Sequence, residues 1–428
     1  MSFNITSMLL GVAFLMLLRV PVAFCLLIPS LFYIAFTDAV TLTIVLQRMT
    51  SGVDSFPLLA VPMFILMGNL ANEAGIADRL YRFALAVLGH IKGSLGYVTV
   101  ASSLVFSWMS GSAISDAAAL GKIQVPAMAN RGYERGFAVG LTASSTLIGP
   151  IMPPSVSAVV YGVVSGVSIG GLFLAGVIPA LLITTVLMVI VYIAVRNKPD
   201  LRLPRTSRAD VARVGASAAL SLLTPFIVLG GIFGGIFTPT EAAAVAALYM
   251  LILGVGYGTL RAKQLKAVFA STASISGSIM LIIAAASLFG WVLGREQVPQ
   301  MMATGMLQIT ESPLVFLLIL NVFLLLIGTV MEPNSAVLIL VPVIIPIAAQ
   351  YGIEPIQLGS IIIFNLMVGL LTPPVGLVLF VLSSVTRLSV ATISRAVIPF
   401  LLPLVGILLL VTYVPWVTLA LPGWLGYR

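Results

Sequence analysis

Long apolar runs separated by short polar loops dominate the hydropathy pattern of this 428-residue chain. A transmembrane helix needs about 20 apolar residues, and most of the runs reach that length. The ten-residue alternation typical of a membrane β-barrel does not recur along the sequence. We therefore expect an all-α polytopic membrane protein with crossings near 7–36, 57–74, 137–165, 172–195, 217–237, 240–258, 270–294, 356–386 and 394–421.

The overall composition supports a membrane protein. Hydrophobic residues make up 60% of the chain, charged residues 8%, and the mean hydropathy is +1.18. A soluble core of this size cannot bury so much apolar surface. The first apolar run is interrupted by Arg19 and Pro21, continues to Phe36 and contains no small-residue cleavage site. We therefore expect a retained first helix and not a cleaved signal peptide.

The net charge of +8 comes from bases that gather in short loops, mainly at 196–213 and 261–266. Such loops are typical of the cytoplasmic side of a membrane. They are not interleaved with aromatic residues over a surface, which disfavours a nucleic-acid partner. The single cysteine, Cys25, excludes an intrachain disulfide and a cysteine-based metal cluster. We expect His90, the single histidine, to lie in a loop and not to bind metal.

An internal repeat is the most informative feature of the sequence. The pair Pro153-Pro154 recurs 220 residues later as Pro373-Pro374. The same ungapped offset joins Pro126 to Pro346, Gly132 to Gly352, Glu134 to Glu354, Gly149 to Gly369 and the segment 177–182 to 397–402. Matched proline, glycine and glutamate in one register predict a duplicated unit.

The loop charges predict that the two copies are inverted. The loop 38–54 holds one arginine and two aspartates, whereas its partner near 261–266 holds three bases and no acid. The three other loop pairs reverse in the same way, which indicates opposite directions across the membrane. The count of crossings fits if the segments 94–128 and about 313–348 are re-entrant hairpins.

Each copy also contains a broken helix, "GPIMPPS" in the first and "GLLTPPVG" in the second. Unpaired backbone at membrane depth costs several kcal/mol per group unless it is buried in protein or solvates a ligand. Each copy has a hairpin tip rich in small polar residues, at Ser107–Ala119 and at Gly328–Leu338. Hydroxyl, amide and backbone oxygens favour Na⁺, and helix N-termini favour an anionic group. The alternative is that these residues only permit close helix packing.

Several polar residues near the tips and breaks are candidate contacts. Acids within membrane spans are functional candidates, although Asp116 and Glu332 could instead accept hydrogen bonds from hairpin-tip amides. Arg295 could pair with an anionic substrate or, as we favour, extend outward toward polar surroundings. Glu241 fits a capping box with Thr238, which predicts a helix start. The candidate substrate contacts are Ser145, Asn365, Asp116, Arg295 and Glu332.

Four segments together resemble the large membrane subunit of the tripartite ATP-independent periplasmic (TRAP) transporters. They are "GSAISDAAALGKIQVPAM", "GLTASSTLIGPIMPPS", "GGIFTPTEAAAVAALY" and "GLLTPPVGLVLFV". The resemblance implies Na⁺-driven secondary import of an organic acid in the bacterial inner membrane, with no cofactor beyond the coupling ion. It also implies an elevator mechanism, a periplasmic substrate-binding protein and a small four-helix membrane subunit, here a separate chain.

The resemblance also implies two Na⁺ sites, each between a tip and a break, with the substrate between the tips near the midplane. The copies differ in detail, because Met152 stands where the second copy has Thr372, and Ser155 where it has Val375. The first site would comprise Ser110, Ser112, Gly149 and Pro150, and the second Gly328, Asn334, Ser335, Gly369 and Thr372.

The expected domain organisation follows the two copies. Residues 1–92 form the scaffold of the first repeat, and 93–195 its hairpin and broken helix in the transport domain. A basic cytoplasmic linker at 196–214 leads to a linking span and the second scaffold part at 215–304. Residues 305–428 complete the transport domain.

Other functions remain open at this level. A self-sufficient Na⁺/carboxylate symporter of the same architecture would need no binding protein, and a passive channel would show no Na⁺ dependence. An intramembrane enzyme is disfavoured because the sequence has no HExxH motif, no histidine within a span and no paired acids on one helix. The sequence does not decide among C4-dicarboxylates, sialic acids, 2-oxo acids, sulfonates and ectoine-like solutes.

Overall fold

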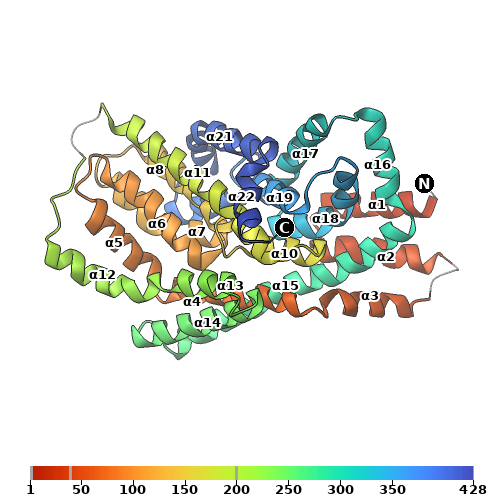
Figure 1. The fold of residues 1–428 in the computed structure, drawn as a ribbon, viewed down its shortest axis with the longest axis horizontal. Coiled ribbons are helices and arrows are strands. Elements are labelled where there is room, and N and C mark those ends of the chain that lie inside the picture. The colour runs from red at the N-terminus through yellow and green to blue at the C-terminus, as the bar shows by residue number, and fades with distance from the viewer. Residues whose placement is uncertain (1–2, 38–40, 198–200, 428) are drawn as a thin grey trace.

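The computed structural model describes residues 3–37, 41–197 and 201–427, and every regular element in these ranges is a helix (Figure 1). Within them, eight helical stretches are long and apolar enough to cross a membrane. Seven of the nine predicted crossings correspond to one of these stretches, which confirms the all-α expectation. The eight are Phe56–Glu73, Arg135–Ser165, Ile169–Val195, Arg208–Phe233, Pro239–Gly256, Ala262–Arg295, Pro333–Gln350 and Val390–Tyr413.

The helices follow one another with short connections. The first half comprises α1 (Phe3–Leu17), α2 (Val22–Ala35), α3 (Thr43–Val53), the 3₁₀ turn η1 (Phe56–Leu59), α4 (Ala60–Glu73), α5 (Ile76–Leu88), α6 (Ser94–Ser110), α7 (Ala113–Ala129), α8 (Arg135–Ser145), α9 (Ile148–Ile151), α10 (Val156–Ser165) and α11 (Ile169–Val195). The second comprises α12 (Arg208–Leu222), η2 (Phe226–Gly230), α13 (Gly231–Phe233), α14 (Pro239–Gly256), α15 (Ala262–Arg295), α16 (Val298–Ile309), α17 (Pro313–Gly328), α18 (Pro333–Gln350), α19 (Pro355–Gly369), α20 (Leu377–Thr386), α21 (Val390–Tyr413) and α22 (Trp416–Trp424).

The prediction of a single first crossing at 7–36 is wrong. The chain reverses after α1, so that α1 and α2 lie side by side and a β-carbon on Gly11 would lie 3.4 Å from Cγ of Pro29 (Figure 1). In one continuous helix these residues would be about 27 Å apart. Arg19 takes a left-handed conformation with φ of 59°, and Pro21 has no N–H with which to continue α1. The count of crossings that supported the inverted orientation of the two copies therefore lacks its first helix.

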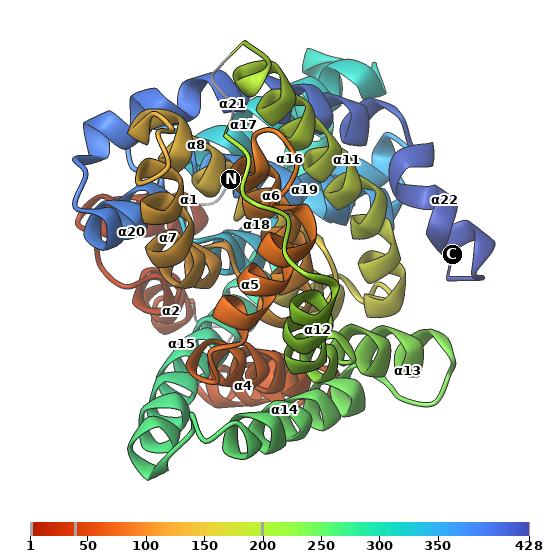
Figure 2. The ribbon, with the colours of Figure 1, turned by 90° about the vertical axis from the view of Figure 1, so that its left-hand side faces the viewer.

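The helices form two layers. Helices α4, α14 and α15 lie along one side of the molecule, and α6–α11 with α17–α22 make up the other (Figures 1 and 2). The 34-residue helix α15 packs along α2, α3 and α4 and so connects the helices of the first layer over its whole length. Residues 198–200 of the predicted basic linker and residues 38–40 of the first loop lie outside the described residues.

Helices in the second layer recur at the offset found in the sequence. Ser94 and Pro313 begin α6 and α17, and Ala113 and Pro333 begin α7 and α18. Helices α8 and α19 begin at Arg135 and Pro355, and α11 and α21 at Ile169 and Val390. The spacing thus stays within one residue of 220, and each of the two predicted hairpins is a pair of helices joined by a short turn.

The stretch Arg135–Ser165, which contains the first break, is the most enclosed of the eight. Its most apolar part is 89% buried within the protein, compared with 39–56% for the other seven stretches. Irregular backbone at membrane depth is tolerated where protein surrounds it. The fold therefore shields the first break from lipid.

Two smaller predictions are also confirmed. Thr238 caps α14, where its hydroxyl accepts from the Glu241 N–H at 3.3 Å and the Glu241 carboxylate accepts from the Thr238 N–H at 2.8 Å. This reciprocal pair is the predicted capping box. His90 lies in the turn after α5.

Candidate functional site

The first hairpin tip packs directly on the first break. Helix α6 ends at Ser110, Gly111 turns the chain with φ of +63°, and Ser112 caps α7. A β-carbon on Gly111 would lie 2.8 Å from the Pro154 carbonyl oxygen, so a larger residue cannot occupy this position. Glycine at the tip therefore permits both the turn and the contact.

The first break is a short extended segment between two helices. Helix α9 ends at Ile151, Met152 is extended, and α10 begins at Val156. Ser155 caps α10 by accepting from the Ala158 N–H at 3.2 Å, and its hydroxyl donates to the Pro150 carbonyl oxygen at 2.5 Å. The predicted helix break is thus confirmed, and the Ser155 side chain bridges it.

The second tip meets the second break in the corresponding way. A β-carbon on Gly369 would lie 2.5 Å from the Gly328 carbonyl carbon, so the backbones of α17 and α19 touch. The Gly376 N–H donates to the Thr329 carbonyl oxygen at 3.0 Å across the break. Between Gly369 and α20 the chain is not helical, and the peptide bonds Pro153-Pro154 and Pro373-Pro374 are both cis.

Glu332 accepts hydrogen bonds at the second tip, which is one of the two roles that the sequence suggested for it. Its Oε2 accepts from the Ser335 N–H at 2.9 Å and from the Ser335 hydroxyl at 3.2 Å. Its Oε1 accepts from the Asn334 amide at 2.7 Å. The side chain thereby caps the N-terminus of α18, where a carboxylate is favourable.

Asp116 lies at the first tip and break and not in the open cavity. Its side chain is fully buried, and its carboxylate occupies the space that a β-carbon on Gly149 would need. Ser110 is the neighbouring side chain that can donate to it, and no hydrogen bond of ordinary geometry reaches either carboxylate oxygen from the described residues. A buried carboxylate with so few donors is costly, so this position calls for a cation or a proton. The structure brings Asp116 together with Ser110, Ser112 and Gly149.

The residues predicted for the second ion site separate into two groups. Gly328, Gly369 and Thr372 meet at the second break, where the Thr372 hydroxyl donates to the Val368 carbonyl oxygen at 2.9 Å. Asn334 and Ser335 instead line the cavity described below. Both ends of the Asn334 amide are engaged, because its Oδ1 also accepts from the Ser157 hydroxyl at 2.8 Å.

A cavity of about 540 Å³ lies between the two tips and the first layer. Residues 110–115 of the first tip, 332–335 of the second, and Pro150, Val156 and Ser157 at the first break line one side. The other side belongs to α4 and α15, through Ile65, Gly68, Asn69, Ser274, Ile275, Ser278, Ile279 and Ile282. Sequence reasoning missed Asn69, Ser157, Ser274 and Ser278, although the hydroxyl-rich run "STASISGS" at 271–278 of an apolar helix was a visible signal.

The charge of the cavity is set by helix ends and not by basic side chains. The described residues that line it include one acid, Glu332, and no lysine, arginine or histidine. The N-termini of α7, α10 and α18 border it, but Asp116 lies in the first turn of α7 and Glu332 caps α18, so only α10 has no acid at its cap or in its first turn. Helix N-termini carry a partial positive charge and free N–H donors. The N-terminus of α10 can therefore receive an anionic group in the cavity without a salt bridge.

Three predicted substrate residues lie away from the cavity. Ser145 accepts from the Ser103 hydroxyl at 2.9 Å in a buried network with Gln124, and Asn365 donates to Asn321 Oδ1 at 2.5 Å. Both are fully buried between helices, where they hold the broken helices against α6 and α17. Arg295 stacks on Trp291, about 20 Å along α15 from the cavity residue Ile282, so its outward orientation is the one observed.

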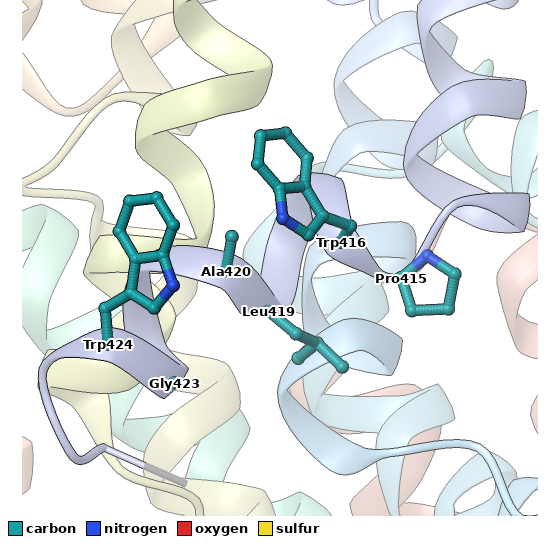
Figure 3. A pocket seen from close by; sticks show the side chains of 6 residues that line it. All are labelled: Pro415, Trp416, Leu419, Ala420, Gly423 and Trp424. Atoms are coloured by element: carbon teal, nitrogen blue, oxygen red, sulfur yellow. The ribbon is translucent and has the colours of Figure 1, made fainter.

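A shallow surface hollow, of about 380 Å³, lies on α22, and none of the predicted site residues lines it. Trp416 and Trp424, 61% and 74% exposed, project from the same side of the helix with Ala420 between them (Figure 3). Exposed tryptophans are typical of residues at a membrane–water interface. We therefore assign the functional site to the cavity between the tips.

The sequence family described as tripartite ATP-independent periplasmic transporter, DctM component, matches residues 9–417. The chain belongs to this family. It is accordingly a large permease component of a TRAP transporter and a multi-pass membrane protein, and the family to which it belongs is one of transporters. The resemblance seen in the sequence is confirmed.

Among its relatives, this permease is 46% identical to the sialic acid TRAP transporter large permease protein SiaM of Vibrio cholerae, over 95% of this chain and 96% of SiaM. It is 42% identical to the C4-dicarboxylate TRAP transporter large permease protein DctM of Pseudomonas aeruginosa, over 87% of this chain and 88% of that protein. These two relatives differ in the solute that they are named for.

Two solved structures share the fold of the permease. The Alcanivorax borkumensis YdaH transporter superposes with a TM-score of 0.62 at 15% identity, covering 88% of each chain. Neisseria gonorrhoeae MtrF superposes with a TM-score of 0.57 at 14% identity, covering 86% of this chain and 84% of MtrF. At such identities the likeness concerns the fold alone.

Proposed function

We propose that the permease carries out Na⁺-coupled secondary import of an organic acid. The observation that carries the proposal is the cavity between the two hairpin tips, whose described lining has no basic side chain and which faces the N-terminus of α10, where no acid lies at the cap or in the first turn. Helix dipoles and free amides hold a carboxylate weakly, so a second charge must help to retain it. A cation bound beside the cavity supplies that charge.

Asp116 supports the location of the first Na⁺ site. Its carboxylate is fully buried, adjoins Ser110 and Gly149, and receives no hydrogen bond of ordinary geometry from the described residues. Carboxylate, hydroxyl and carbonyl oxygens suit a hard cation. We therefore assign Asp116 to this ion site together with Ser110, Ser112, Gly149 and Pro150. Gly328, Gly369 and Thr372 form the second site, which Asn334 and Ser335 would join only after rearrangement.

The movement that we propose is of the elevator type. The recurrence of helix starts at an offset of 220 supports two copies of one unit, and the reversed loop charges support their inversion. The tips and breaks would move together along α4 and α15. Residues 93–195 and 305–428 then form the transport domain, and 1–92 with 215–304 form the scaffold, joined by the linker at 196–214.

The family implies that this chain lies in the bacterial inner membrane and works with two partners. A periplasmic substrate-binding protein would deliver the solute, and a small four-helix membrane subunit would complete the complex as a separate chain. The named solutes of the relatives make sialic acids and C4-dicarboxylates the first candidates. Related carboxylates and sulfonates are the next candidate solutes.

Reconstitution in liposomes tests the function. The permease with its small subunit and binding protein should accumulate a radiolabelled acid only when an inward Na⁺ gradient is present. Accumulation that persists when choline replaces Na⁺ would contradict Na⁺ coupling. The alternative, a self-sufficient Na⁺/carboxylate symporter, predicts uptake by this chain alone, so uptake without the two partners would overturn the tripartite assignment.

A further inference from the structure

A second cavity, of about 530 Å³, adjoins the first one. Asn69, Ser115 and Ala118 line both cavities. The second is also lined by Asn72, Glu73, Asp78, Lys122, Ala267, Val268 and Ser271. The shared residues show that the two spaces are neighbouring parts of one groove.

The groove runs between the first hairpin and the first layer. Along α7 its wall continues from Ser115 to Lys122, and along α15 it continues from Ser274 back to Ala267. The polar groups change along this path, because hydroxyls, amides and one carboxylate, that of Glu332, surround the first cavity, whereas Glu73, Asp78 and Lys122 line the second. A larger number of charged side chains is expected where a path leads from the protein interior to water.

One hydrogen bond crosses the groove where the two cavities meet. The Asn72 side-chain amide, on α4, donates to the Ser115 hydroxyl, on α7, at 2.6 Å. The Asn72 Oδ1 atom is buried and has no hydrogen-bond partner among the described residues. The preceding amide on the same helix, Asn69, donates instead to Thr272 on α15 at 2.9 Å, within its own layer. Asn72 therefore joins the two layers, whereas Asn69 joins helices of one layer.

We propose that the Asn72–Ser115 hydrogen bond is the gate between the solute cavity and its passage to the side of Asp78 and Lys122. The inference rests on the proposed function, because a hairpin that slides along α4 must break this bond in each cycle. A hydrogen bond between neutral groups is weak enough to open repeatedly and directional enough to hold the hairpin in register. Asn72 is accordingly a positioning residue, which acts on the solute through the hairpin.

Reversible bridging tests the gate. In a Cys25→Ala parent, which has no other cysteine, Asn72→Cys and Ser115→Cys are combined in the complete complex and bridged with Hg²⁺. Na⁺-driven uptake of sialic acid and succinate, used as probes, should fall at least ten-fold on bridging and return after dithiothreitol. The two single-cysteine variants, under the same treatment, control for effects of Hg²⁺ and should change less than two-fold.

Two outcomes would overturn the gate. One is a bridge, verified by mass, that leaves uptake unchanged, and the other is the absence of bridging with and without Na⁺ and probe. If the cysteine pair does not assemble, Asn72→Leu provides the second measurement. Loss of a gate should raise solute exchange relative to net uptake at least three-fold, whereas a purely structural defect lowers both equally and would contradict the proposal. A parent complex without Na⁺-dependent uptake would contradict the proposed function instead, and bridging would still report whether the two residues meet.

Discussion

The carboxylate of Asp116 fills the space beside Gly149 that a β-carbon would occupy. This relationship joins α7, which follows the first tip, to the helix that precedes the first break. It explains why a glycine precedes Pro150 there, because any side chain would displace the buried acid. The pair therefore defines the point at which tip, break and proposed cation meet.

Gly149→Ala should weaken Na⁺ binding. The added methyl group must push the Asp116 carboxylate aside, and overpacking of this kind costs about 1–3 kcal/mol, which corresponds to a roughly 5- to 150-fold loss of Na⁺ affinity. Na⁺ titration of uptake measures the effect. Gly136→Ala is the matched control, because a β-carbon there makes only ordinary contacts, at 3.6 Å to Glu134 and 3.9 Å to Ala396. Equal Na⁺ affinity in the two variants would contradict the proposed site.

Asp116→Asn should remove the part of the stabilisation by Na⁺ that comes from the first site, without lowering the stability of the Na⁺-free protein. The substitution keeps the shape of the side chain and removes a buried charge to which the described residues donate no hydrogen bond of ordinary geometry. A ligand at 100 times its dissociation constant stabilises by about 2.7 kcal/mol, so the Na⁺-dependent rise in melting temperature should shrink by the share of the first site. The measurement is thermal unfolding of the purified complex in NaCl and in choline chloride. A Na⁺ response equal to that of the parent would assign Asp116 a structural role.

Glu332→Ala should raise the KM for the solute as well as lower the melting temperature. Removal of an N-terminal cap costs about 0.5–2 kcal/mol, and here it also releases Asn334 and Ser335, which line the cavity. Glu354→Ala is the control, because Glu354 caps α19 by accepting from the N–H groups of Ile356 and Gln357 at 2.8 and 3.0 Å, away from the cavity. We expect a similar loss of stability and an unchanged KM in the control. If KM also stays constant in Glu332→Ala, the tip does not shape the solute site.

Asn365→Ala should destabilise the protein and leave solute selectivity unchanged. Asn365 donates to Asn321, whose amide in turn donates to the Thr412 hydroxyl at 3.1 Å, and all three side chains are buried. Loss of a buried partner costs about 1–3 kcal/mol. A double-mutant cycle with Asn321→Ala, followed by thermal unfolding, should show strong coupling. A changed preference between sialic acid and succinate would instead restore Asn365 as a substrate contact.

Local signals in the sequence determined much of the fold. Proline and glycine placed the breaks, small polar residues placed the tips, and the Thr238–Glu241 pair placed the start of α14. The offset of 220 residues predicted which helices correspond. These features act through backbone geometry and capping within a few residues, so they can be read without knowledge of distant contacts.

Tertiary structure alone decided which side chains share a site. It turned the first apolar run back on itself, placed Asp116 against Gly149, enclosed Ser145 and Asn365 in separate polar networks, and directed Arg295 away from the cavity. It also brought Asn69, Asn72, Ser274 and Ser278 from the first layer to the groove. The physical reason is that the direction in which a buried polar group points depends on the helices packed around it. These helices can lie more than 200 residues away in the chain, as for Asn69 and Thr272 with a separation of 203. The hydropathy of one segment indicates which of its residues are buried, but it does not indicate which residues of other helices they contact.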